Sequence, residues 1–96
     1  MLTKRQQQLY NSFYESTHKN EYLDQKTELL IGLSAAMAMN CAPCTSYYLK
    51  QAKKAKISKD EISEVLAKVM EVAAGQKSVQ MQDVFKSYKI DIESYE

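Results

Sequence analysis

The chain contains only two cysteines, Cys41 and Cys44, and they form a C-x-x-C motif. At this spacing two thiols can close a small disulfide or share one metal ion. Pro43 lies between them and suits the first turn of a helix, so the motif is predicted to start a helix. The free N–H groups of a helix start stabilise a thiolate. Such a thiolate can attack a peroxide or a disulfide, and the second cysteine then closes the intramolecular disulfide.

Metal binding is a weaker interpretation of the same two cysteines. A zinc ion needs about four protein ligands, and the only histidine, His18, lies outside any ligand-like spacing. A metal site would therefore need ligands from another subunit, and we predict no metal and no cofactor. We expect His18 to be a surface residue at a helix end. The alternative to both the redox and the metal interpretation is that the two cysteines are buried side chains without a function.

Charge and hydropathy exclude several other classes of function. The 96 residues include 13 basic and 12 acidic side chains, which leaves a net charge of +1. This balance provides no basic surface for nucleic acid or for an anionic membrane. No apolar run is long enough to span a bilayer, and residues 1–8 lack the apolar segment of a signal peptide. We expect a cytoplasmic protein. In that compartment two nearby cysteines are catalytic, redox-sensing or metal-binding rather than a permanent structural disulfide.

The fold class predicted from the sequence is all-α, with residues 1–96 forming a single small domain of about five helices. Only two Gly and one Pro interrupt the helical patterns. The expected helices cover about residues 4–17, 24–39, 41–55 and 58–75, with a fifth segment around 81–88. Asn40 is expected to end the second helix and Gly75 the fourth, while Ser58 and Glu61 form a capping box. The tail after Tyr88 is expected to be extended.

The apolar stripes are wide for a chain of this size. Residues 29–39 are nearly uncharged, which predicts burial of the second helix on most sides. We infer that part of the apolar surface is buried between subunits. The lysines at positions 50, 53 and 54 are expected to form a solvated face, with anion binding as the less favoured alternative.

Three stretches resemble, in order and spacing, the core domain of the carboxymuconolactone decarboxylase family. They are residues 23–33, 41–48 and 58–66, within a similarity that covers about residues 22–75. The alkylhydroperoxidase-D-like branch is the closer one, because it carries the C-x-x-C. The resemblance implies an all-helical homo-oligomer, with a trimer or hexamer as the expected form.

Active members of that family carry a glutamate twelve residues before the first cysteine and a histidine four residues after the second. The two groups relay protons to and from the thiols. The corresponding positions here are Leu29 and Tyr48, and Glu28 precedes the first by one residue. A one-residue shift turns a side chain by about 100° around a helix, so Glu28 cannot replace the missing acid without a local bulge. Tyr48 is a poor base at neutral pH, but its hydroxyl can donate a hydrogen bond to a thiolate or orient a water.

The function implied by the resemblance is that of a thiol-dependent antioxidant or disulfide-exchange protein with weak hydroperoxide reductase activity. Its catalytic residues are Cys41, Cys44 and Tyr48, with Cys44 attacking and Cys41 resolving. The expected partners are a peroxide or protein disulfide as substrate, a dithiol electron-donor protein and further copies of the chain, but neither nucleic acid nor membrane. The alternative is a non-catalytic oligomeric redox sensor or binding protein that has lost the proton relay. Lactone decarboxylation is disfavoured, because no acid–base set for it is present.

Overall fold

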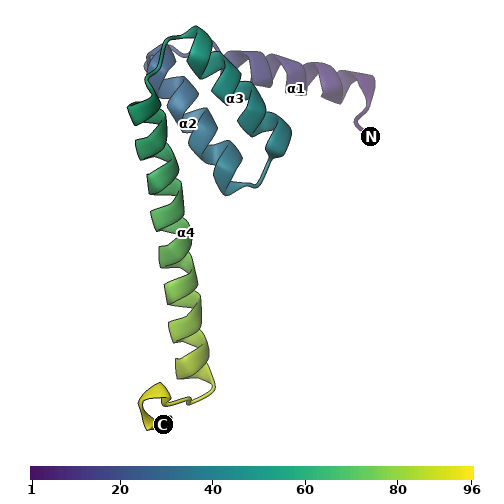
Figure 1. Cartoon of the computed structure of the whole chain (residues 1–96). Helices are drawn as coiled ribbons and strands as arrows, with labels where there is room; N and C mark the ends of the chain where they lie inside the picture. The colour runs from purple at the N-terminus through teal and green to yellow at the C-terminus, as the bar shows by residue number, and fades with distance from the viewer.

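The computed structural model describes all residues 1–96 and is entirely helical, as predicted (Figure 1). It contains four α-helices and one short 3-10 turn near the C-terminus. These elements are α1 (Lys4–Ser16), α2 (Gln25–Ala38), α3 (Ala42–Lys54), α4 (Lys59–Ser87) and η1 (Ile92–Ser94). No helix combines the length and apolarity that would be needed to cross a bilayer.

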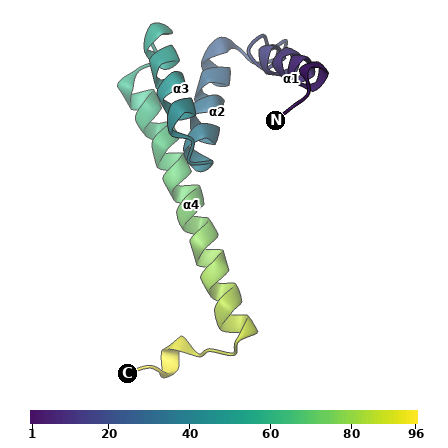
Figure 2. The ribbon, with the colours of Figure 1, turned by 90° about the vertical axis from the view of Figure 1, so that its right-hand side faces the viewer.

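Helices α2 and α3 form an antiparallel hairpin that packs against the first half of α4 (Figures 1 and 2). Five side chains are buried where these helices meet, and Leu33 alone is completely enclosed. The buried set is Leu29, Leu33, Ala36, Ala52 and Ile57. Tyr48 of α3 and its C-cap residue Ala55 pack against the part of this core formed by Leu29, Ala52 and Ile57. The hairpin therefore fixes the start of α3, where the cysteines lie.

Side-chain caps set where the helices begin. Asp24 accepts a hydrogen bond from the Thr27 N–H at 2.7 Å and caps α2. Ser58 and Glu61 form the predicted capping box at the start of α4. Each cap satisfies N–H groups that have no partner within the helix, which is why these short polar residues define the starts.

Left-handed residues set where α2, α3 and α4 end. Asn40, Lys56 and Lys89 have φ of 56°, 60° and 55°. Beyond each of them the next residue donates its N–H to a carbonyl five positions back, as in a Schellman motif. The predicted role of Asn40 as the end of α2 is confirmed. The two lysines were not expected, because Lys has no special tolerance of the left-handed region.

Gly75 does not end a helix, so the predicted stop at this residue is wrong. Helix α4 continues through it to Ser87, and the fourth and fifth expected helices are one element of 29 residues. A glycine inside a helix costs only about 1 kcal/mol relative to alanine, which the flanking helix-forming residues can offset. The chain therefore has four helices rather than five.

Much of the apolar surface lies outside the core of the single chain. Within the single chain α2 is buried on one side only, and Ile31 and the C-cap residue Met39 are 51% and 78% exposed. Helix α1 and the distal half of α4 extend away from the hairpin (Figures 1 and 2). The tail forms the turn η1 rather than the predicted extended segment, and it is exposed. The radius of gyration of 19.2 Å exceeds the value of about 12.5 Å typical of a compact chain of this length.

Candidate redox site

Cys41 and Cys44 are joined by a disulfide at the start of α3, with their Cα atoms 5.3 Å apart. Cys41 is the N-cap residue of this helix, and Pro43 lies in the first turn. The backbone N–H of Cys44 donates to the sulfur of Cys41 at 3.3 Å. In the reduced protein the same N–H is placed to stabilise a Cys41 thiolate.

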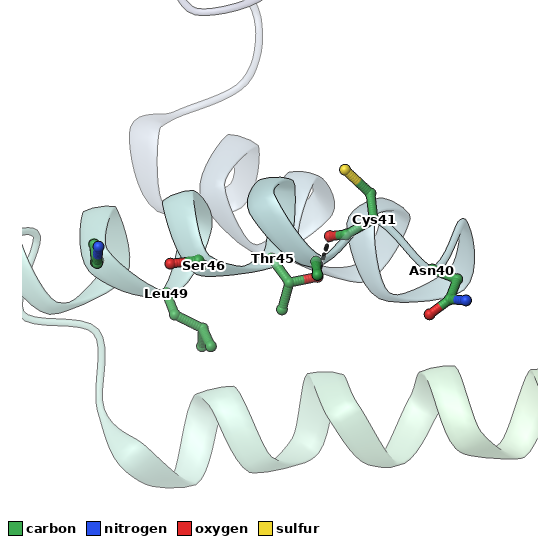
Figure 3. A pocket seen from close by; sticks show the side chains of 7 residues that line it. Asn40, Cys41, Thr45, Ser46 and Leu49 are labelled. Atoms are coloured by element: carbon green, nitrogen blue, oxygen red, sulfur yellow. Dashed lines mark hydrogen bonds between the residues drawn. The ribbon is translucent and has the colours of Figure 1, made fainter.

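The backbone of Cys41 is held by both helices of the hairpin. Its N–H donates to the carbonyl of Ala36 in the last turn of α2, at 2.9 Å. Its carbonyl accepts hydrogen bonds from the N–H and the hydroxyl of Thr45, both at 2.9 Å, and the hydroxyl bond is the dashed line in Figure 3. The backbone of Cys41 is therefore held by contacts that do not involve its sulfur.

The two cysteine residues differ in their overall exposure to solvent. Cys44 is exposed, whereas Cys41 is half-buried. A mainly apolar cavity of about 250 Å³ adjoins both cysteines, and a shallow groove of about 470 Å³ runs from Cys41 along α3 (Figure 3). Apart from the cysteines, the cavity is lined by Gly32, Ala35, Ala36, Met39 and Tyr48. The groove is lined by Asn40, Cys41, Ala42, Thr45, Ser46, Leu49 and Lys50. Neither space contains a carboxylate or an imidazole.

Tyr48 borders the cysteine cavity and lies against Gly32 of α2. Cys41, Cys44 and Tyr48 are spaced i, i+3, i+7, which places them on one face of α3. A Cβ atom built on Gly32 would overlap the Tyr48 ring. The missing side chain at position 32 is therefore what lets the tyrosine ring lie across α2.

The Tyr48 phenol is less acidic than an ordinary tyrosine. Burial raises its pKa above the usual value of 10.0, and the negative charge of Glu28 and the neighbouring Tyr14 and Tyr47 raise it further. The hydroxyl is therefore protonated at neutral pH. It can donate a hydrogen bond to a thiolate or to a water, but it cannot act there as a base.

Neither Leu29 nor Glu28 places a carboxylate beside the thiols, where active family members are expected to have their glutamate. Leu29 is buried in the core with Ala52 and Ile57. Glu28 lies on a regular stretch of α2 and borders a different cavity from the one beside the cysteines. It shares that second cavity with Tyr48, a proximity that the sequence did not reveal.

His18 is more enclosed than the sequence suggested. Its ring is 4.4 Å from that of Tyr14 and 6.1 Å from that of Tyr47, between centroids. Its Nδ1 lies 2.9 Å from the carbonyl of Tyr14, so this nitrogen carries the proton in the neutral ring. Its Nε2 is buried without a hydrogen-bond partner. The residue therefore links the end of α1 to Tyr47 of α3.

The remaining candidate residues are less informative. The lysines at positions 50, 53 and 54 are exposed, as expected for a solvated face. No group of three or more His, Cys, Asp or Glu side chains is arranged as a metal site.

Sequence reasoning missed Gly32 and Thr45. A glycine inside an otherwise apolar helix is a signal of close approach by another group, and it could have identified the first.

The comparisons with known proteins identify the family of the chain and agree with its fold. The sequence matches the carboxymuconolactone decarboxylase family over residues 6–86, and the chain belongs to that family. A crystal structure of a protein from Methanobacterium thermoautotrophicum, a structural-genomics target, has the same fold with a TM-score of 0.75. It is 24% identical, and the match covers 81% of this chain and 88% of that one. No curated protein matches the chain significantly.

Proposed function

We propose that this chain is a thiol–disulfide oxidoreductase of the alkylhydroperoxidase-D-like branch that works through Cys41 and Cys44. The observation that carries the proposal is the disulfide at a helix start, between an exposed residue, Cys44, and a half-buried one, Cys41, whose sulfur accepts an N–H. Disulfide exchange needs a thiolate, a good leaving thiolate and access, and it does not need a separate base.

The proposal gives the two cysteines different roles. A reducing thiolate attacks the sulfur of Cys44, the more exposed of the two residues, forms a mixed disulfide there and expels Cys41 as a thiolate. The Cys44 N–H stabilises that leaving group. A second thiolate of the dithiol then attacks the mixed disulfide and releases Cys44. The products are one oxidised donor and two reduced cysteines, so two electrons have entered the protein.

In the oxidising half of the cycle a hydroperoxide reoxidises the two reduced cysteines to the disulfide. The Cys44 thiolate attacks a hydroperoxide oxygen, which yields a Cys44 sulfenic acid and, after protonation, an alcohol. The Cys41 thiolate attacks the Cys44 sulfur and expels water with one further proton, which closes the disulfide. Tyr48 is the hydrogen-bond donor in the cavity beside these sulfurs. Because neither neighbouring space holds a carboxylate or an imidazole, this half-reaction is expected to be slow, by roughly 10² to 10⁴ relative to a site with a general base.

The alternative function is a non-catalytic redox sensor, and the absence of a base near the thiols favours it. The two functions differ in turnover, because a sensor is oxidised once and has no fast reductive step. The test is to follow cumene hydroperoxide consumption and reduction of a small disulfide by the protein with excess dithiothreitol. Many equivalents turned over per subunit support the oxidoreductase, and a single equivalent supports the sensor.

Two variants test the assignment of roles. Cys41→Ser should accumulate a mixed disulfide on Cys44, visible as a mass increase of the peptide that contains residues 41–44. Cys44→Ser should form no such adduct and lose turnover. Adducts on Cys41 in the second variant, with full adduct loss in the first, would reverse the assignment.

A homo-oligomer, with a trimer or hexamer as the expected form, belongs to the same proposal. The chain exposes 8432 Å², whereas a compact chain of its mass exposes about 5,600 Å². The difference is comparable to the area buried in obligate interfaces, which span about 2,000–5,000 Å² in total. We place the protein in the cytoplasm, where a dithiol electron-donor protein can keep the cysteine pair cycling.

A further inference from the structure

A second cavity, of about 220 Å³, shares Tyr48 and Gly32 with the cysteine cavity but has a different chemical character. It lies between the segment that follows α1 and the first turns of α2. Its other lining residues are Thr17, Asn20, Leu23, Glu28 and Ile31. The proposed redox cycle uses none of these five side chains.

Glu28 is the only charged side chain in this cavity, and it has no cationic partner. It is half-buried. The ion pairs of the chain are Lys26 with Glu61 and Lys68 with Glu71, and no side-chain hydrogen bond reaches Glu28. A carboxylate that is partly removed from water without a counter-ion is unfavourable, so a cation in the cavity would be stabilised.

The other walls suit an alkylated cation rather than a bare ion. The Tyr48 ring presents an aromatic surface that attracts an ammonium group, and Leu23 and Ile31 supply apolar contact for a carbon chain. The side-chain amide of Asn20 donates to the carbonyl of Thr17 at 2.9 Å, which leaves its oxygen free to accept a hydrogen bond. Acceptors, an aromatic face and one negative charge are together the features that recognise an alkylammonium group.

We propose that this cavity binds an alkylammonium group, with Glu28 as its counter-ion and the Tyr48 ring as its aromatic wall. An anion is disfavoured, because no basic residue lines the cavity. A neutral apolar ligand would leave the Glu28 carboxylate unpaired. The influence of Glu28 on its surroundings agrees with this, since its charge raises the pKa of both Tyr47 and Tyr48. The proposal stands independently of the redox activity.

The direct test is binding of n-butylammonium chloride to the full-length oxidised protein, followed by ¹⁵N NMR. We expect saturable shifts of the amide signals of Glu28, Gly32 and Tyr48, at a millimolar dissociation constant. Sodium chloride and n-butanol serve as controls for ionic strength and for the carbon chain. Equal shifts with n-butanol, or no saturable shift with the amine, would overturn the proposal.

A matched pair of variants tests the counter-ion. Glu28→Gln should weaken binding by at least about tenfold, because the amide oxygen can still accept a hydrogen bond but no negative charge pairs with the ammonium group. Glu64→Gln removes the same charge from an exposed position on α4 and should leave binding unchanged. Unaltered affinity in Glu28→Gln would refute the assignment. If that variant fails to fold, the comparison of amine with alcohol on the wild-type protein decides the question.

The ammonium group can come from a free amine or from a lysine side chain of a peptide. A blocked lysine, Nα-acetyl-lysine methylamide, separates the two sources. Equal affinity for butylammonium and blocked lysine indicates recognition of the alkylammonium group alone, whereas tighter binding of the blocked lysine indicates a peptide source. Both results support the cavity as an alkylammonium site, and failure of both probes rejects it.

Discussion

Replacing Gly32 by alanine tests the contact that positions Tyr48. Alanine is favoured over glycine inside a helix by about 0.5–1 kcal/mol. At position 32 the new methyl group would overlap the Tyr48 ring, and overpacking of this kind typically costs about 1–3 kcal/mol. The expected result for Gly32→Ala is a net destabilisation of about 1 kcal/mol.

Gly75→Ala is the matched control, because a Cβ at Gly75 meets no atom within 4 Å. The same chemical change there should stabilise the protein by about 0.5–1 kcal/mol. The difference between the two variants isolates the clash with Tyr48. For a chain of this length, about 1 kcal/mol shifts Tm by about 4–8 °C, so the two variants should differ by at least about 4 °C.

The assay is thermal unfolding followed by circular dichroism at a fixed protomer concentration, since association changes the apparent Tm. Gly32→Ala is also measured in a Tyr48→Ala background, where the methyl group has room and should become stabilising. If Gly32→Ala stabilises the wild-type chain as much as Gly75→Ala does, the ring does not lie on Gly32. The proposed placement of the hydroxyl beside the cysteines would then be wrong.

Three further predictions follow from the structure. Leu33→Ala, which truncates the one completely enclosed side chain, should cost about 2–5 kcal/mol in urea unfolding, whereas an equal loss for the exposed Met39→Ala would show that the core lies elsewhere. Asp24 and Glu61 have pKa values lowered from 3.8 and 4.5, mainly by hydrogen bonds to the Thr27 backbone and to Lys26. The stability that these two carboxylates contribute is therefore complete above their ordinary pKa values and lost as the pH falls through their lowered pKa values. Asp24→Asn should accordingly flatten a plot of Tm against pH in this acid range. The difference between ultraviolet titrations of the wild type and Tyr48→Phe should show a phenol that ionises above pH 10.0, and a Tyr48 that titrates at or below it would contradict the burial of the ring.

The elements that sequence reasoning located well are those set by local contacts. The starts of α2 and α4 follow from Asp24 and Ser58, since a cap acts within three residues of the chain. The end of α2 at Asn40 is local in the same sense. The prediction at Gly75 failed because a glycine ends a helix only where the chain adopts the left-handed conformation, and here the helix-forming residues on both sides carry α4 through it.

The candidate site was predicted only in its covalent part. The spacing of the cysteines allowed a disulfide or a shared metal, because two residues between them bring the sulfurs together on a helix start, and the structure contains the disulfide. The contact of Tyr48 with Gly32 depends on how α3 lies across α2, and sixteen sequence positions separate the two residues. The enclosure of His18 depends in the same way on the placement of α1, which neither periodicity nor capping specifies.

The double attachment of Cys41 has a consequence for how a partner can detect the oxidation state of the protein. The three hydrogen bonds of its backbone, to Ala36 and from Thr45, involve no sulfur atom, so opening the disulfide does not require any of them to break. We therefore expect reduction to free the side chains of Cys41 and Cys44 while the helical hairpin keeps its outline. On this view the protein takes up two electrons without a change in its backbone conformation. A partner that prefers one oxidation state must touch the sulfur atoms themselves.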